Sequence, residues 1–147
     1  MKDAMALDEN LLDKLKKLNA LAAFNTWCGL EVLHAEAGVA EIAIRWKPEL
    51  GQYSGFLHAG LVATLIDTAC GFAAVTIGGT ELLASHFSVN CLRPAIGECF
   101  IAKARVVKPG KTQFFTSCEL FAVVNGEHKL VATGETLLLV VSGSAAS

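Results

Sequence analysis

A single carboxylate interrupts a long uncharged stretch of this sequence. Asp67 is the only charged residue in the segment 58–75, HAGLVATLIDTACGFAAV, whose other residues are apolar, small, or a lone hydroxyl, thiol or imidazole. Burial of an unpaired charge costs several kcal/mol or raises the pKa of the carboxyl group. Two interpretations stay open: Asp67 is a structural acceptor of hydrogen bonds, for example from Thr64, or it is kept for chemistry on a bound molecule.

The start of the same segment carries a second chemical feature. The sequence SGFLHAG places Gly55 and Gly60 around a turn that leads into a helix. The first N–H groups of a helix have no partner within it, so those of Ala59 and Gly60 are expected to point beyond its end. Such groups bind anions and developing oxyanions well.

These two features are too far apart to act together within one chain. Asp67 lies eight residues after Ala59, which is about 12 Å along a helix axis. An aspartate side chain spans only a fraction of that distance. If both groups contact one reacting carbonyl, one of them must come from a second copy of the chain, and a dimer would then carry two symmetric sites.

The helix that holds Asp67 has one side made of small residues. Bulky residues such as Leu65, Ile66 and Phe72 fill its other sides and suit packing into a curved sheet. The small side would let another backbone or a thin ligand approach the carboxylate. Projected at about 3.6 residues per turn, this side carries Gly60, Thr64, Asp67, Gly71, Ala74 and Gly78.

The pattern of the rest of the chain predicts one further helix and a series of strands. An amphipathic helix begins near Asp8 and is broken by NTWCG at 25–29. The alternation after Gly38 and the pair Asn125-Gly126 predict β-hairpins. We therefore expect a single α+β domain over residues 1–147, with an N-terminal helix within 1–25, a central helix covered by a mostly antiparallel sheet, and a flexible tail at 142–147.

Composition excludes several classes of function. The chain is 53% hydrophobic and 18% charged, with a net charge of −2, which fits a globular protein and argues against a nucleic-acid binder. The charged N-terminus lacks the apolar core of a signal peptide, and Asp67 with its neighbouring glycines argues against a membrane span. The five cysteines are expected to be buried free thiols in a reducing cytoplasm. The histidines are isolated, so no metal site is expected.

The loop and helix together resemble the hotdog-fold thioesterases, in particular the PaaI-like acyl-CoA thioesterases. That family carries a loop N-x-x-G-x-x-H-G-G followed by a helix with an acidic residue, and the matching stretch here is QYSGFLHAGLVATLID. The segments FSVNCLRPAIGE and VVKPGKTQFFTSCELF also look like later strands of the family. The resemblance implies a hotdog fold: a long central helix wrapped by a curved antiparallel sheet.

The resemblance also implies an activity, namely hydrolysis of an aryl or medium-chain acyl-CoA by a homodimer or a dimer of dimers, with no cofactor beyond the CoA of the substrate. It makes Asp67 the general base or the nucleophile. The N–H of Ala59, helped by Gly60, would polarise the thioester carbonyl. Gln52 would orient water or substrate, and His58 would brace the loop.

The implied substrate contacts involve further residues. Gly55 and Thr64 lie in the matching loop and helix, and Ser85 or its neighbour Ala84 stands where the family places an assisting hydroxyl. Basic residues could grip the CoA phosphates or could belong to an ordinary solvated surface. The candidates for that contact are Arg93, Lys108 and Lys111.

Two departures from the family leave alternatives open. Gln52 replaces the usual asparagine, and Ala59 replaces the first glycine after the histidine. Either change would suit a non-catalytic protein that binds or senses acyl thioesters. A hotdog hydratase or dehydratase using His58 and Asp67 is the other alternative, although its typical motifs are missing from the sequence.

Overall fold

The computed structural model describes residues 2–141, with side chains described from residue 11 onward. Its elements follow the expected order of one helix, two strands, the central helix and four strands, with two short helical elements added. In chain order they are α1 (Lys2–Leu21), α2 (Ala23–Cys28), β1 (Glu31–Glu36), β2 (Val39–Arg45), the 3₁₀ helix η1 (Pro48–Leu50), α3 (Ala59–Gly78), β3 (Leu82–Cys91), β4 (Cys99–Lys108), β5 (Gln113–Val124) and β6 (Glu127–Val140).

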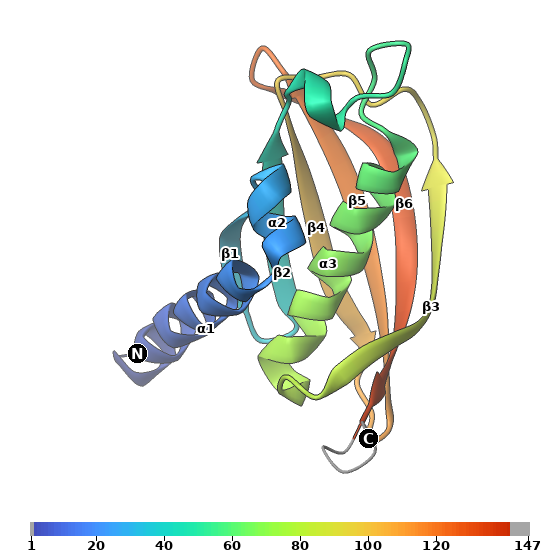
Figure 1. Cartoon of the computed structure of the whole chain (residues 1–147). Coiled ribbons are helices and arrows are strands. Elements are labelled where there is room, and N and C mark those ends of the chain that lie inside the picture. The colour runs from blue at the N-terminus through green and yellow to red at the C-terminus, as the bar shows by residue number, and fades with distance from the viewer. Residues whose placement is uncertain (1, 142–147) are drawn as a thin grey trace.

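The six strands form one antiparallel sheet that curves around α3. Their order is β1-β2-β4-β5-β6-β3, and every neighbouring pair is antiparallel. Figure 1 shows α3 lying in the hollow of the sheet, with α1 extending away from the body beside β1. A long helix wrapped by a curved antiparallel sheet is the hotdog architecture, so the expected fold class is confirmed.

The central helix is buried on the sides that carry its bulky residues. Val62, Leu65 and Ile66 lie in the core, as do most residues from Ala69 to Val75. By length and composition α3 could also cross a membrane, but here it packs against the sheet. The side expected to be small and accessible is open only in its first half, since Ala74 is fully buried and packs with Phe114 and Leu138.

Close approach of α3 to the sheet depends on Gly134 in β6. A Cβ atom at this position would lie 2.6 Å from Cγ2 of Ile66 in α3 and 2.6 Å from the carbonyl oxygen of Ser88 in β3. Real side chains do not tolerate such distances, so any larger residue must push the helix or the strand away. Gly134 therefore fixes how deeply the helix sits in the sheet.

Replacing Gly134 with alanine is expected to lower the free energy of unfolding by about 1–3 kcal/mol through overpacking. Denaturant titration followed by circular dichroism would measure this. Gly71→Ala in α3 is the control: the nearest atom to its added Cβ would be 4.0 Å away, and alanine favours a helix over glycine by about 1 kcal/mol. Equal effects of both substitutions would contradict the packing role of Gly134.

The N-terminal region differs from the expectation in two ways. The helix α1 begins at Lys2, so Asp8 lies inside it and does not cap it. The segment 25–29 does not break the helical structure; most of it forms α2, which ends at Gly29 with φ 77°. Leu15 is fully buried against the core, which confirms the amphipathic face of the first helix. The expected flexible tail at 142–147 lies outside the described residues.

The turns of the two hairpins have the backbone conformation that their residues predict. Gly38 follows β1 with φ 78°, and Asn125 and Gly126 both have positive φ, 50° and 79°, between β5 and β6. Positive φ at both central residues is the signature of a type I′ hairpin turn, which Asn-Gly favours.

The strand β3 forms one edge of the sheet and leaves apolar side chains uncovered. It pairs only with β6 among the described strands, and Leu83 and Phe87 are 61% and 47% exposed. Proteins usually cover or charge such an edge, because its free N–H and C=O groups can pair with another chain. This edge is therefore a suitable surface for a second copy of the chain.

All five cysteines are free, as expected, but they are not all buried. Cys28, Cys70 and Cys118 lie in the core, whereas Cys99 is partly exposed and Cys91 is exposed on β3. The expectation of burial was wrong for Cys91, because an edge strand leaves one of its sides open in the isolated chain.

Candidate active site

Asp67 lies in an apolar cavity of about 280 Å³ between α1, α3 and β3. Among residues 11–141, no side chain or backbone group forms a hydrogen bond or ion pair with its carboxylate. Burial raises the pKa of Asp67 above its ordinary value. The cavity is lined by Leu18, Asp67, Thr68, Gly71, Phe72, Val75, Thr80, Leu82, Leu83, Ala84 and Leu138.

The structural interpretation of Asp67 required a hydrogen-bond donor such as Thr64. The hydroxyl of Thr64 instead donates to the carbonyl oxygen of Gly60 at 2.9 Å, one turn earlier in α3. A partly buried carboxylate without a donor in the described chain is a cost to stability. Its position in a cavity is typical of a group kept for function.

The raised pKa makes a prediction about stability. Because the carboxyl group holds its proton more tightly in the folded chain, its ionisation destabilises that state; the cost is absent below the unfolded pKa of about 3.9 and complete above the folded pKa. Asp67→Asn is therefore expected to raise Tm near neutral pH, with a gain that shrinks toward about pH 4. Calorimetry across this range measures it, and a gain independent of pH would contradict the assignment.

The start of α3 leaves one free N–H group. His58 is its N-cap: its Nδ1 atom accepts a hydrogen bond from the N–H of Gly60 at 2.8 Å. The N–H groups of Leu61 and Val62 both donate to the carbonyl oxygen of His58. Within the described part of the chain, nothing accepts from Ala59. The expectation that Gly60 also offers a free donor was wrong, because the His58 ring takes that N–H.

Ala59 is compatible with this role despite its side chain. The positive φ in the loop before α3 is at Gly55, with φ 83°, while Ala59 is not among the residues with positive φ. Its Cβ therefore causes no backbone strain, and its N–H survives the replacement of a glycine. A Cβ at Gly60, in contrast, would lie 2.9 Å from Nδ1 of His58 and would disturb the cap.

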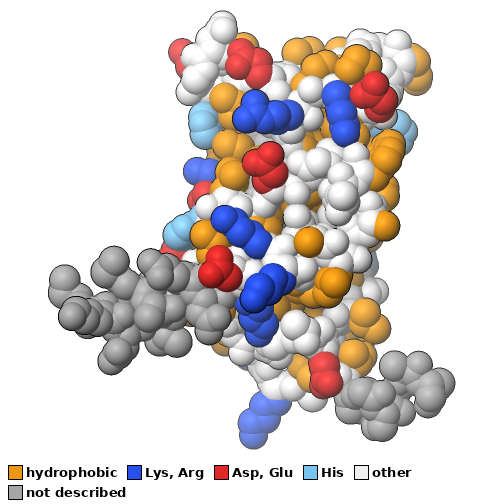
Figure 2. Space-filling model, turned by 60° about the vertical axis from the view of Figure 1, so that its left-hand side comes forward, with side chains coloured by type: hydrophobic (Ala, Val, Ile, Leu, Met, Phe, Trp, Pro, Cys, Tyr) orange, Lys and Arg blue, Asp and Glu red, His pale blue; other side chains and the backbone are white. Residues whose placement is uncertain are grey.

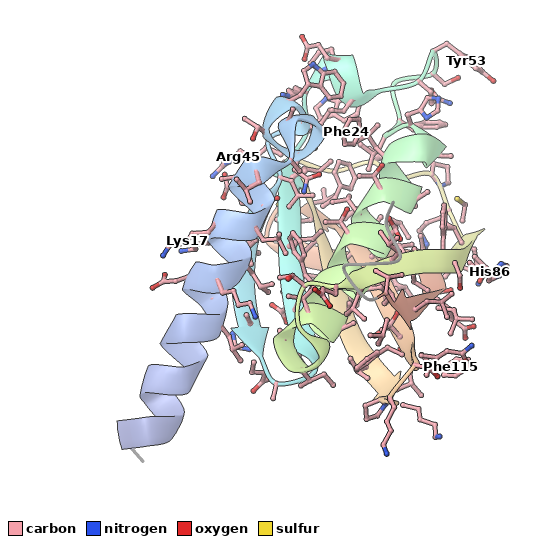
Figure 3. All side chains as sticks on the ribbon, turned by 60° about the horizontal axis from the view of Figure 1, so that its bottom comes forward. Lys17, Phe24, Arg45, Tyr53, His86 and Phe115 are labelled. Carbon is pink, nitrogen blue, oxygen red and sulfur yellow. The ribbon has the colours of Figure 1, made fainter. Side chains whose placement is uncertain are left out.

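Gln52 lies in a second cavity, of about 340 Å³, together with Ala59 and Arg93. The side-chain oxygen of Gln52 accepts hydrogen bonds from the N–H groups of Ser54 and Phe56, which closes the loop before α3. Its amide nitrogen then remains the group with which it can contact a bound molecule. Tyr53, at the tip of this loop, is fully exposed and projects from the molecule (Figure 3).

The two candidate features lie in separate cavities of one chain. The cavity of Asp67 and the cavity of Ala59 have no lining residue in common, and α3 is continuous between them. The expected separation of acid and donor along the helix is therefore confirmed. No single chain, as described from residue 2 to 141, brings both groups to one carbonyl.

Ser85, which was expected near the carboxylate, does not line the cavity of Asp67. The register of β3 against β6 shifts between Ala84 and His86, and Ser85 in this bulge donates to the carbonyl oxygen of Leu137 at 3.3 Å. Ala84 lines the cavity of Asp67. Of the candidates Ser85 and Ala84, the residue that shares a cavity with Asp67 is therefore Ala84, which has no hydroxyl group.

The basic candidates lie at opposite ends of the sheet. Arg93 follows β3 and lines the cavity of Ala59, whereas Lys108 and Lys111 flank the turn between β4 and β5. On the face drawn in Figure 2, Lys and Arg side chains are interspersed with Asp and Glu. Lys103 and Glu41 form one ion pair between β4 and β2, with their charged atoms 3.9 Å apart. Within one chain, the three candidates do not form a single phosphate site.

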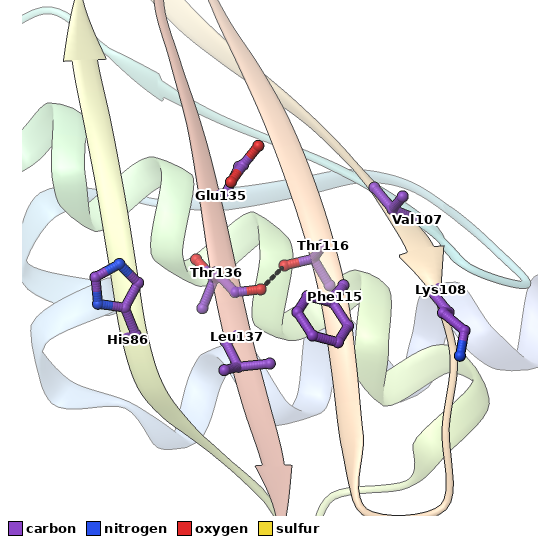
Figure 4. A pocket seen from close by; sticks show the side chains of 8 residues that line it. All are labelled: His86, Val107, Lys108, Phe115, Thr116, Glu135, Thr136 and Leu137. Carbon is purple, nitrogen blue, oxygen red and sulfur yellow. Dashed lines mark hydrogen bonds between the residues drawn. The ribbon is translucent and has the colours of Figure 1, made fainter.

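A cavity larger than these two lies elsewhere and was not expected from the sequence. It measures about 510 Å³ and lies around Phe115 and Leu137, with His86 and Lys108 at its sides (Figure 4). These side chains are on the face of the sheet that points away from α3. Since this cavity contains neither Asp67 nor the start of α3, it is a weaker candidate for the reaction. In the described residues, no group of three His, Cys, Asp or Glu could hold a metal ion.

Comparison with known proteins shows which family of sequences and structures the chain resembles. A model of the thioesterase superfamily matches residues 54–128. The chain is 29% identical to human acyl-coenzyme A thioesterase 13 over 88% of this chain and 93% of that protein. A thioesterase family protein from Silicibacter pomeroyi has a similar structure, with 34% identity, TM-score 0.86 and coverage of 90% and 99%. The PaaI protein of Escherichia coli shares the fold at 21% identity, with TM-score 0.75 and coverage of 90% and 97%.

Proposed function

Because the chain belongs to the thioesterase superfamily and is a thioester hydrolase, we propose that it cleaves an aryl or medium-chain acyl-CoA at the interface of a homodimer. The observation that carries this proposal is that one chain holds two catalytic groups that it cannot bring to the same carbonyl. Asp67 is a carboxylate without a partner in one apolar cavity, and Ala59 offers a free helix N–H in another. Each part supplies what the other lacks for attack on a thioester carbonyl.

The edge strand β3 offers a way to bring the parts together. Its first residues, Leu82 to Ala84, line the cavity of Asp67, and Cys91 at its end lines the cavity of Ala59. If two copies pair antiparallel through β3, the end of one strand lies beside the start of the other. The cavity of Ala59 from one protomer then adjoins the cavity of Asp67 from its partner, twice per dimer.

In this arrangement two protein groups, the carboxylate of Asp67 and the N–H of Ala59, are enough for hydrolysis of the thioester. Asp67, as general base, takes a proton from water while the water oxygen attacks the acyl carbon; as nucleophile, it would attack that carbon itself and water would release the acid. The N–H of Ala59 from the partner subunit stabilises the negative charge on the carbonyl oxygen. On the general-base route the C–S bond then breaks, and the thiolate takes up the proton held by Asp67. On the nucleophile route the C–S bond breaks as the mixed anhydride with Asp67 forms; water then hydrolyses this anhydride, and the thiolate takes up the proton that the water releases.

The remaining candidates fit around this centre. Gln52 can hold water or the thioester with its free amide nitrogen, while His58 fixes the loop by capping α3. Antiparallel pairing would also carry Arg93 of one protomer toward the end of the other that holds Lys108 and Lys111, which favours a shared contact to CoA phosphates. The proposal places the protein in the cytoplasm, as a dimer or a dimer of dimers, and requires no cofactor besides the CoA of the substrate.

The direct test is thiol release from a panel of acyl-CoAs, together with the mass of the protein in solution. We expect hydrolysis of aryl or medium-chain substrates by a dimer or a tetramer. Hydration of crotonyl-CoA without thiol release would instead identify a hydratase. Binding of acyl-CoA without turnover would identify a sensing protein, and full activity of a monomer would overturn the shared site.

A further inference from the structure

The cavity of Asp67 has a wall that comes from outside the central helix and the sheet. We propose that Leu18 of α1 is a specificity-determining residue that limits the size of the acyl group. This inference rests on the proposed function, since it takes this cavity as the acyl site. Among the α1 residues whose side chains the structure describes, 11–21, Leu18 is the one that lines this cavity, to which Asp67 also belongs.

The chemistry of the cavity suits the apolar part of a substrate. Apart from Asp67 and the two threonines Thr68 and Thr80, its lining consists of apolar side chains and Gly71. A thioester carbonyl must lie near the carboxylate to react. The acyl group attached to that carbonyl then extends along the apolar lining, and α1 closes this space on one side.

Leu18 is held in place by its neighbours on α1. Leu15, one turn earlier, is fully buried in the core. Asn19, the next residue, donates through Nδ2 to the carbonyl oxygen of Leu30 at 2.8 Å and accepts at Oδ1 from Asn25 at 3.0 Å. These contacts fix the last turns of α1 against β1 and α2. A wall fixed in this way can discriminate by size, because a flexible one would move aside.

The cavity is small enough for one side chain to matter. Its volume of about 280 Å³ is near the lower end of small-molecule sites, which measure about 300–1,000 Å³. Removing most of the Leu18 side chain adds room for further methylene groups, and a larger residue takes room away. In an apolar pocket one methylene group can change kcat/KM by about tenfold or more.

The test compares kcat/KM for butyryl-, hexanoyl-, octanoyl-, decanoyl-, benzoyl- and phenylacetyl-CoA. We expect Leu18→Ala to raise the ratio of long to short substrates by about tenfold, and Leu18→Trp to lower it by a similar factor. Leu11→Ala is the matched control: Leu11 lies two turns earlier on the same helix, packs partly buried against the same core, and is not part of the cavity. For this variant, the ratio of kcat/KM between long and short substrates is expected to equal that of the unchanged chain.

The outcomes separate this inference from the proposed function. If the unchanged chain hydrolyses no acyl-CoA, the proposed function fails. If it hydrolyses them and both Leu18 variants keep its substrate profile, the function stands and the role of Leu18 is overturned. If Leu11→Ala shifts the profile as strongly as Leu18→Ala, general loosening of α1 is responsible and the inference is again overturned. Circular dichroism of each variant shows whether it is folded. If one of Leu18→Ala and Leu18→Trp is unfolded, the substrate profile of the other decides whether Leu18 limits the acyl group.

Discussion

Asp67→Asn is expected to lower kcat for thioester hydrolysis by about 10³-fold, within the range of about 10²–10⁴ typical of a lost general base. The asparagine has nearly the same shape but cannot accept a proton from water or form an acyl intermediate. Because Asp67 has no hydrogen-bond or ion-pair partner in the described chain, the substitution breaks no contact that holds the fold. Steady-state thiol release, with circular dichroism to show folding, measures the loss.

Two further readouts show whether the carboxylate itself is responsible. Burial raises the pKa of Asp67, and only the ionised form can act as base or nucleophile. The logarithm of kcat/KM should therefore rise with pH up to a pKa above the usual aspartate range and then level off. Glu41→Gln, which removes a partly exposed carboxylate paired with Lys103, should leave the rate unchanged. A variant Asp67→Asn that keeps most of its activity would exclude this residue from the reaction.

Ala59→Pro is expected to lower kcat by about 10²–10³-fold, the cost of one lost oxyanion donor. Proline removes the N–H and is well tolerated at the first position of a helix. His58, directly before it, has φ −59° and ψ 137°, which is the backbone region that a residue before proline adopts. The substitution therefore removes the donor with little change to the backbone.

The matched control at this position is Ala59→Gly, which keeps the N–H. We expect it to lose far less activity than Ala59→Pro, although glycine adds flexibility to the start of the helix. Both rates come from the same thiol-release assay. Equal losses from the two substitutions would indicate that the N–H group has no part in the reaction.

Patterns of apolar residues and turn residues were enough to predict the two long helices and the six strands, but not the short helical elements α2 and η1. The uncharged segment around Asp67 predicted a buried central helix, and Asn125-Gly126 predicted a hairpin that the structure confirms. These signals are local, since a turn or an apolar helix requires only its own residues to be of the right type. The separation of Asp67 from Ala59 was equally predictable, because helix geometry fixes it.

Several features of the candidate site could not be predicted, because they depend on contacts that the spacing of residue types does not determine. The capture of the Gly60 N–H by His58 depends on the rotamer of the histidine. The placement of Ala84 in the cavity depends on a bulge in β3, and a one-residue shift in a strand exchanges its two faces. The contribution of Leu18 to the cavity is a long-range packing contact of α1. No local pattern in the sequence pointed to that contact.

The central claim is that each active centre combines Asp67 of one protomer with Ala59 of its partner. It is tested most directly by heterodimers made from one Asp67→Asn chain and one Ala59→Pro chain, isolated through two different affinity tags. One of their two sites receives both defects and the other receives none. We predict about half the activity of the unchanged dimer, while each variant paired with itself stays inactive. A heterodimer as inactive as its parents would contradict the shared site.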